Sequence, residues 1–222
     1  MTVTVTIVDY GLGNLFSVSR AIERAGAAAL ITGDPAAIER ATHLILPGVG
    51  AFLDGMAGLH QRELVEPLRR YGQSGRPLLG ICLGMQLLFD LSEEFGRHEG
   101  LGLVPGQVRA IPATGTDGRP HRIPHVGWSE LQAPPARRDW GDSLLADVAP
   151  GTSVYFVHSF TAYPADPADR LADCDYDGRP ISAAVARGRL TGCQFHPEKS
   201  GEAGLGILRR FVGNRPSGSR NP

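Results

Sequence analysis

Residues 77–89 read PLLGICLGMQLLF, and this stretch decides the fold. The apolar run at 77–81 predicts a buried strand, and the apolar residues after Cys82 predict a helix. A glycine two residues before Cys82 and another two after it are typical of a nucleophile elbow, a sharp strand-to-helix turn that exposes a reactive side chain. The pattern predicts a nucleophilic Cys82 beside the positive end of a helix dipole, which stabilises a thiolate.

A base and a carboxylate follow far downstream, where residues 194–200 read QFHPEKS. Pro197 favours an extended backbone at His196 and prevents a helix from continuing through the segment. Side chains two residues apart in an extended segment face the same way, so we expect Glu198 to fix the tautomer of His196. Cys82, His196 and Glu198 thus form a predicted triad with a thiol nucleophile.

Each of these residues also has a simpler interpretation. A single cysteine after an apolar strand is often a small buried side chain, and a His-x-Glu pair is often a loop or surface pair. The catalytic interpretation is favoured because the elbow glycines, the proline and the pair occur together. A metal site is disfavoured, since no close Cys-x-x-Cys or His-x-x-x-His spacing anchors one, and no cofactor is expected. The residues weighed as metal ligands are Cys82, His158, His196 and Glu198.

Composition limits the class of protein. The chain has 222 residues, of which 42% are hydrophobic, and a net charge of −1. The length predicts a single domain over residues 1–213, followed by a disordered tail at 214–222. The near-neutral charge argues against a nucleic-acid or membrane-surface partner. The cysteines are widely spaced and suit a reducing compartment, and we find neither a signal peptide nor a run of ~18 apolar residues. These features predict a cytoplasmic protein.

Strand and helix patterns alternate in the first half of the chain. Strands are expected at 3–8, 28–31, 44–46 and 77–81, and helical segments at 14–25 and 52–71. This alternation predicts an α/β fold, a doubly wound and mostly parallel sheet that binds ligands beyond the carboxyl ends of its strands.

Shorter β-rich runs follow between residues 102 and 192, and a helix at 203–212 closes the fold. We expect these runs to extend the same sheet as mixed or antiparallel strands. They lie at 108–111, 126–131, 154–160, 171–176 and 181–186.

One motif imitates a dinucleotide-binding fingerprint: residues 11–16 read GLGNLF after a predicted strand. Phe16 stands where the third glycine would let the helix pack closely on the strand. Cofactor binding is therefore disfavoured, and the glycines are interpreted as a tight turn that could take part in an interface.

With the loop PGVG at 47–50, the elbow and the His-Pro-Glu segment resemble the class I glutamine amidotransferase family. Further runs, from near residue 5 to near residue 212, resemble those members of the family that serve as the glutaminase subunit of a two-subunit synthase. These runs are DYGLGNL at 9–15, PGVGAF at 47–52, HVGW at 125–128, YFVHS at 155–159 and FHPEKS at 195–200.

The resemblance implies that Cys82 attacks the side-chain amide of L-glutamine. The N–H of Leu83 and an N–H from the Val49 and Gly50 segment would hold the oxyanion. Gln86 and Glu94 could instead be polar residues on a partly exposed helix and loop, and His158 could be a hydrogen-bonded core histidine. The residues implied to bind glutamine are Gly50, Gln86, Glu94, His158, Ser159 and Phe160.

The resemblance also implies a partner, a (β/α)8-barrel cyclase that receives the ammonia in a heterodimer. The expected face lies near Asn14, Val49, Trp128 and Lys199. Lys199, the only lysine, would pair with an acidic residue of the cyclase, or is simply a solvated charge. Trp128 would gate the ammonia path, or serves as a core or interface tryptophan.

The chain departs from the family pattern at three positions that affect only fine contacts. Ser129 stands where asparagine is expected, Cys193 takes an apolar position before Gln194, and Phe160 replaces tyrosine. Two other functions stay open: a γ-glutamyl hydrolase or peptidase that acts alone, and a non-catalytic binding subunit.

Overall fold

The computed structural model describes residues 2–135, 139–141 and 143–213, and its larger sheet contains nine strands. These are β1 (Thr4–Val8), β2 (Ala28–Thr32), β3 (His43–Leu46), β4 (Leu78–Ile81), β8 (His125–Gln132), β9 (Ser153–His158), β11 (Arg170–Tyr176), β12 (Arg179–Arg187) and β13 (Leu190–Cys193). Their order is β2-β1-β3-β4-β13-β12-β11-β8-β9. Neighbours from β2 to β13 pair in parallel, and those from β13 to β9 pair antiparallel.

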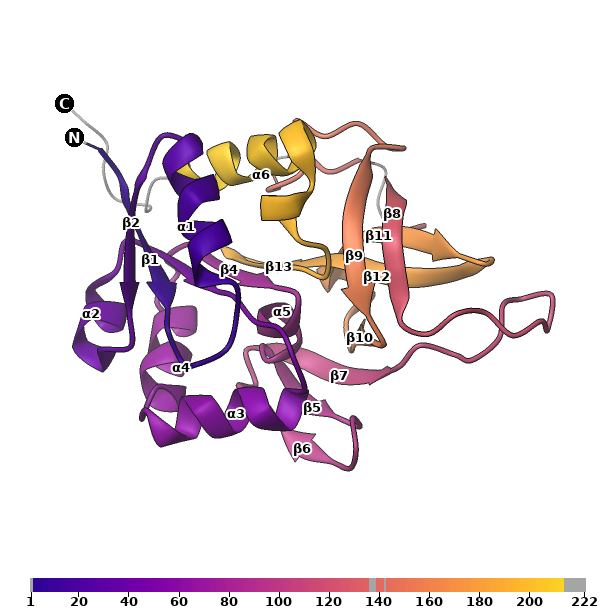
Figure 1. Cartoon of the computed structure of the whole chain (residues 1–222), viewed down its shortest axis with the longest axis horizontal. Helices are drawn as coiled ribbons and strands as arrows, with labels where there is room; N and C mark the ends of the chain where they lie inside the picture. The colour runs from indigo at the N-terminus through magenta and orange to yellow at the C-terminus, as the bar shows by residue number, and fades with distance from the viewer. Residues whose placement is uncertain (1, 136–138, 142, 214–222) are drawn as a thin grey trace.

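Helices cover both faces of the parallel part (Figure 1). One face carries α1 (Leu15–Arg24) and α6 (Gly201–Gly213), and the other carries α2 (Pro35–Arg40), α3 (Phe52–Gln61) and α4 (Val65–Gln73). A hydrophobic core lies on each face of this sheet. Alternate side chains of β3 enter opposite cores, because Ile45 packs in one and Leu44 in the other. The predicted doubly wound sheet with an antiparallel extension is confirmed.

The predicted N-terminal strands and first helix lie within a residue or two of the expected bounds. The helical region expected at 52–71 divides into α3 and α4, with Glu63 between them at a φ of 57°. The short helix α2 was not predicted. No helix among the described residues has the length and apolar character that crossing a membrane requires. The single-domain assignment stays a prediction, and the tail predicted at 214–222 lies outside the described residues.

A second sheet corrects the expectation that every β-rich run extends the first. Its strands are β5 (Phe89–Ser92), β6 (His98–Glu99), β7 (Val104–Ala110) and β10 (Phe160–Pro164), in the order β10-β7-β5-β6. The run predicted at 154–160 therefore divides at Ser159, between β9 of the large sheet and β10 of the small one. Residues 158–160 thus lie where the chain passes from one sheet to the other.

The helix after Cys82 is also shorter than predicted, since α5 covers only Leu83–Gln86. Main-chain groups just beyond it bond to a distant segment instead of continuing the helix. The N–H of Leu101 donates to Leu87 at 2.9 Å, and that of Val104 donates to Leu88 at 2.9 Å. These long-range bonds satisfy the carbonyls that a longer helix would have used.

The elbow glycines are required because three main-chain segments meet there. A Cβ at Gly84 would lie 1.8 Å from the carbonyl oxygen of Leu46, and one at Gly80 would lie 2.8 Å from the carbonyl oxygen of Gly84. A Cβ at Gly48 would lie 2.3 Å from the Tyr10 hydroxyl, which itself donates to the Pro47 carbonyl at 2.7 Å. Side chains at these positions would force the elbow away from β3.

Replacing Gly84 with alanine tests this packing. We expect Gly84→Ala to lower the free energy of unfolding by at least ~2 kcal/mol, because the clash is with main chain that cannot move aside. Gly206→Ala is the matched control: a Cβ there meets nothing within 4 Å, and alanine favours the helix by up to ~1 kcal/mol. Urea denaturation measures the free energy of unfolding of each variant. Equal values for Gly84→Ala and Gly206→Ala would contradict the steric role of Gly84.

Candidate active site

Cys82 lies at the sharp turn between β4 and α5, as the elbow pattern predicts. Its φ of 53° and ψ of −112° form a strained backbone conformation for a residue with a side chain. Its N–H donates to the carbonyl of Cys193 on the neighbouring strand at 2.7 Å, which holds the turn in place. The side chain is buried but lines a cavity. Strain that is held at a cavity wall is typical of a functional residue.

His196 reaches the same edge of the sheet because β13 pairs in parallel with β4, with Cys193 opposite Ile81. The N–H of His196 donates to the carbonyl of Tyr155 on β9 at 2.9 Å. Its Nδ1 lies 2.8 Å from Oε1 of Glu198, and both side chains are at most 3% exposed. The structure therefore brings the three residues of the predicted triad to one edge.

The backbone that joins His196 to Glu198 differs from the expected extended segment. Only His196 is extended, with a φ of −99° and a ψ of 96°, and Pro197 then begins the 3₁₀ turn η2 (Pro197–Lys199). Glu198 reaches back across this turn. The Ser200 hydroxyl donates to the His196 carbonyl at 2.7 Å and accepts from the Tyr155 N–H at 3.0 Å, so the turn is fixed from outside.

The charge state of His196 is set by its neighbours. Burial alone would lower the pKa of its imidazole, but hydrogen bonding and charge interactions with Cys82 and Glu198 outweigh burial and raise the pKa to about 9. The Nε2 atom is buried and makes no hydrogen bond of ordinary length and angle to another described residue. The raised pKa favours the protonated imidazolium form of His196 near neutral pH.

The raised pKa of His196 can be measured by a ¹³C-histidine NMR titration. We expect a value of about 9, and a lower value in Cys82→Ala and in Glu198→Gln, because each change removes a group that stabilises the imidazolium. Because the folded value exceeds the ordinary 6.5, the linked stabilisation is complete below pH 6.5 and is lost as the pH rises through about 9. An unchanged pKa in both variants would contradict this electrostatic account.

A cavity of about 310 Å³ opens in front of Cys82 and His196. Every residue predicted to bind glutamine or the oxyanion lines it, together with Pro124 and Val157, which were not predicted. The lining is Val49, Gly50, Cys82, Leu83, Gln86, Glu94, Pro124, Val157, His158, Ser159, Phe160 and His196. The volume and the few polar groups suit a small polar ligand.

Several lining residues also hold one another in place. Glu94 accepts the N–H of Phe52 at 2.7 Å and so caps α3, whose N-cap Ala51 has no side-chain acceptor. The amide nitrogen of Gln86 donates to the Phe160 carbonyl at 3.1 Å and to Oε1 of Gln194 at 2.9 Å. Both residues are at least 90% buried, so neither is the exposed polar residue considered above.

Gln194 is a site residue that the sequence interpretation missed. It is fully buried, and its amide nitrogen lies 3.7 Å from the sulfur of Cys82. The available signal was a polar side chain between the apolar Cys193 and Phe195, directly before His196. A buried amide in that position needs partners, and it finds them in Gln86 and Cys82.

Four residues were predicted to meet a partner. Asn14, Val49 and Lys199 follow the carboxyl ends of β1, β3 and β13, and Trp128 lies on β8. Val49 and Trp128 are 41% and 58% exposed, and Asn14 is also exposed although its side chain caps α1 by accepting from Ser17 at 3.1 Å. Trp128 and Lys199 both contact the ring of Tyr155, at centroid distances of 6.0 and 5.9 Å. Tyr155, not predicted, therefore joins the exposed face to the main chain of His196.

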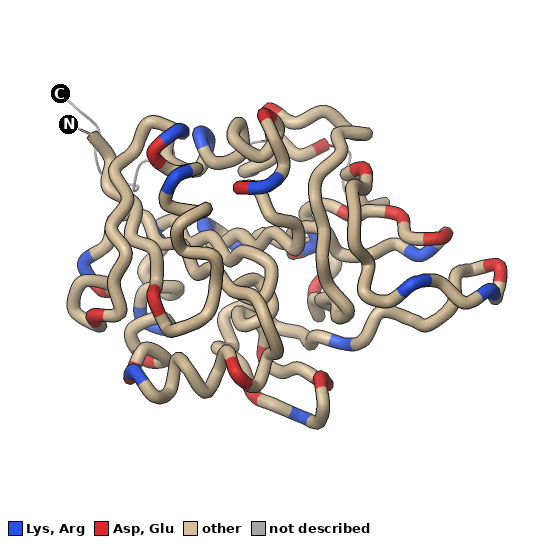
Figure 2. The backbone as a smooth tube through the Cα atoms, in the orientation of Figure 1, with Lys and Arg blue, Asp and Glu red and all other residues tan. Residues whose placement is uncertain are grey.

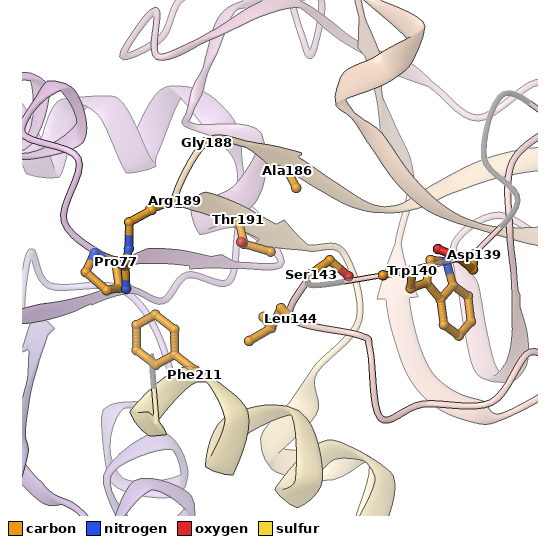
Figure 3. Close-up of a pocket in the computed structure, with 11 residues that line it drawn as sticks. Pro77, Asp139, Trp140, Ser143, Leu144, Ala186, Gly188, Arg189, Thr191 and Phe211 are labelled. Carbon is orange, nitrogen blue, oxygen red and sulfur yellow. The ribbon is translucent and has the colours of Figure 1, made fainter. Parts of the chain in front are cut away.

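A second cavity, of about 460 Å³, lies at the opposite, amino ends of β4 and β13 (Figure 3). Pro77 and Arg189 precede those strands, and Trp140, Leu144 and Phe211 complete its apolar wall. Its described lining contains neither a cysteine nor a histidine. The predicted nucleophile and base therefore make the smaller cavity the candidate active site.

The described residues contain no group of three or more His, Cys, Asp or Glu side chains that could hold a metal ion. The glycines of the dinucleotide-like motif form a turn, with φ values of 92° at Gly11 and 116° at Gly13. Gly13 lies against Pro47, beside the predicted oxyanion loop.

Comparison with known proteins gives the family. The family described as "Glutamine amidotransferase class-I" matches residues 6–214. The chain belongs to the class I glutamine amidotransferase family. It is 50% identical over 209 residues to "Imidazole glycerol phosphate synthase subunit HisH 1" of Legionella pneumophila (strain Lens), covering 94% of this chain and 98% of that protein. It is 47% identical over 207 residues to subunit HisH of Geobacillus thermodenitrificans, covering 93% and 94%.

Two solved structures share the fold at low sequence identity. The chain superposes on PurLQS from Thermotoga maritima with a TM-score of 0.71, at 18% identity and 96% and 99% coverage of the two chains. A second structure, described as a glutamine amidotransferase, gives 0.69 at 17% identity and 94% and 99% coverage. Both confirm the fold expected from the sequence.

Proposed function

We propose that this glutamine amidotransferase hydrolyses L-glutamine to glutamate and ammonia at Cys82, as the glutaminase subunit of an imidazole glycerol phosphate synthase in histidine biosynthesis. One observation carries the proposal: Cys82 and His196 line the same ligand-sized cavity, and Glu198 holds the buried imidazole of His196 at 2.8 Å. The likeness to the HisH subunits, near 50% identity over almost the whole chain, supports the assignment to that synthase.

In the proposed reaction, the Cys82 thiolate attacks the side-chain amide carbon of glutamine and forms a tetrahedral oxyanion. The N–H of Leu83 and an N–H from the Val49 and Gly50 loop stabilise this oxyanion, and the loss of one such donor costs roughly 3 kcal/mol of barrier. His196 donates its proton to the departing ammonia, leaving a thioester on Cys82. His196 then activates water, which hydrolyses the thioester to glutamate.

The cavity wall supplies complementary groups for the amino-acid end of glutamine. Both N–H bonds of the Gln86 amide are engaged, so its Oε1 is the atom that can accept from the substrate ammonium. One oxygen of Glu94 caps α3, and the other adds negative charge on the same side. The N–H groups near Gly50 and residues 158–160 would meet the carboxylate.

Ammonia is useful to a synthase only if it is passed on before bulk water protonates it. The proposed recipient is a (β/α)8-barrel cyclase that binds as a heterodimer, in keeping with the word "subunit" in the names of the relatives. Exposed apolar side chains include Val49 of the cavity wall, which is 41% exposed, and Trp128 on β8, which is 58% exposed. Figure 2 shows charges of both signs interspersed along the described backbone.

A glutaminase assay with and without the cyclase and its nucleotide substrate tests the proposed reaction. We expect low glutamate release from the chain alone, strong stimulation by the loaded cyclase, and no release from Cys82→Ala, which lacks the nucleophile. The Cys82→Ala complex should still form product from supplied ammonium.

Cys174→Ala is the matched control, because Cys174 is a buried thiol in the antiparallel region whose pKa burial raises to about 12. It should retain wild-type release. Glutamate release by Cys82→Ala would contradict the mechanism, and no release by the wild-type complex would favour a non-catalytic binding subunit. Full activity without any partner would favour a hydrolase that acts alone.

Trp128→Ala tests the docking face. We expect the Kd for the cyclase, measured by calorimetry, to rise at least tenfold, because a large exposed aromatic side chain is a typical interface hot spot worth ~2 kcal/mol. Leu30→Ala is the control, since Leu30 is 44% exposed on β2 at the far edge of the sheet. Equal effects of the two changes would contradict the proposed face.

A further inference from the structure

Three side chains form an unbroken hydrogen-bonded relay beside the cavity. Ser129 Oγ lies 2.9 Å from Nε2 of His125, and Nδ1 of His125 lies 3.0 Å from Nε2 of His158. Nδ1 of His158 in turn lies 2.8 Å from the carbonyl oxygen of Phe160. The relay starts on β8, next to the exposed Trp128, and ends in the wall of the cavity.

The direction of every hydrogen bond in the relay follows from its last member. A carbonyl oxygen only accepts, so Nδ1 of His158 carries the proton and, in a neutral ring, Nε2 is an acceptor. His125 must then donate from Nδ1, which leaves its Nε2 to accept the Ser129 hydroxyl proton. The opposite tautomer of His125 would place two unprotonated nitrogens 3.0 Å apart.

Both rings are held neutral and in fixed orientation. Burial lowers the pKa of His125 to about 4 and that of His158 to about 3. His125 is stacked between Phe156 and Tyr176, with ring centroids 4.9 and 4.2 Å away and interplanar angles of 20° and 27°. Neither ring can therefore reverse its donor and acceptor sides without breaking the stack or leaving a buried nitrogen unpaired.

The relay ends on the same carbonyl that orients Gln86. The Phe160 oxygen has two lone pairs, and it accepts from His158 at 2.8 Å and from the Gln86 amide at 3.1 Å. The other N–H of that amide donates to Gln194, whose own amide contacts Cys82. The Phe160 carbonyl and Gln194 together therefore set the orientation of the Gln86 amide at the cavity wall.

We infer that Ser129 and His125 are positioning residues for glutamine binding, which act through His158 and the Phe160 carbonyl to orient Gln86. The inference rests on the proposed glutaminase function and concerns the same cavity. Neither residue lines that cavity, so neither touches the substrate. Their loss should change the apparent affinity for glutamine while leaving Cys82 and His196 in place.

Two substitutions at His125 separate hydrogen bonding from packing. His125→Phe retains the aromatic stack but removes the donor to His158. His125→Asn fills the stack poorly, but its amide nitrogen occupies about the place of imidazole Nδ1 and can still donate. If His125 acts by its hydrogen bond, Asn is the better replacement, and if it acts only by packing, Phe is.

The experiment measures KM and kcat for glutamine with the complete complex of the chain and the cyclase. We expect His125→Phe to raise KM about tenfold with kcat within about twofold of wild type, and His125→Asn to recover most of the loss. Ser129→Ala should raise KM about three- to fivefold and Ser129→Thr, which keeps the hydroxyl, should not. Calorimetry of glutamine binding to the Cys82→Ala chain, with and without His125→Phe, should show the same weakening.

Three outcomes would overturn the inference while leaving the proposed function intact. They are an unchanged KM in His125→Phe, a fall in its kcat alone, and better function in His125→Phe than in His125→Asn. If the wild-type complex releases no glutamate, both fall together. Thermal unfolding of each variant checks the fold. Should His125→Phe fail to fold, the Ser129→Ala and Ser129→Thr pair decides, because Ser129 is only partly buried and both changes are small.

Discussion

The site depends on one pairing, the parallel alignment of β13 with β4 that sets Cys193 opposite Ile81. This alignment lets Cys193 accept the N–H of Cys82 and so holds the strained elbow. It also places the chain that follows β13, with Gln194 and His196, against the thiol. A shift of one residue would turn the side chains of β13 to the other face of the sheet and separate the base from the nucleophile.

Burial around this pairing gives the site its electrostatic character. His196 and Glu198 are almost completely enclosed, and an enclosed imidazolium is stable only beside negative charge. Interactions with Cys82 and with the Glu198 carboxylate are the reason that the pKa of His196 rises despite its burial. The cost of enclosing the imidazole and the carboxylate is offset by their mutual attraction, so the fold itself holds this pair together.

Local patterns were enough to predict much of this protein. The glycines on either side of Cys82 predicted the elbow, and their need is steric, since a Cβ at Gly84 would meet the Leu46 carbonyl. The alternation of strands and helices predicted the doubly wound sheet. The HPE segment predicted the contact between His196 and Glu198, although the turn that makes it is 3₁₀.

Features set by distant partners could not be predicted in this way. The apolar residues after Gln86 fit a helix equally well, but the bonds from Leu101 and Val104 occupy the carbonyls of Leu87 and Leu88, and β5 begins at Phe89. The run at 154–160 gives no sign that it divides at Ser159 between two sheets. The pairing of His125 with His158 likewise depends on the register of β8 with β9, in which the two residues are opposite each other.

The most direct test of the central claim is to trap the covalent intermediate. The complex with the loaded cyclase is mixed with glutamine, quenched in acid within the first turnover, digested and examined by mass spectrometry. The account predicts a glutamyl group on the peptide that carries Cys82, none on the peptides of Cys174 and Cys193, and none in Cys82→Ala. Turnover without an adduct on Cys82, or an adduct on another residue, would contradict it.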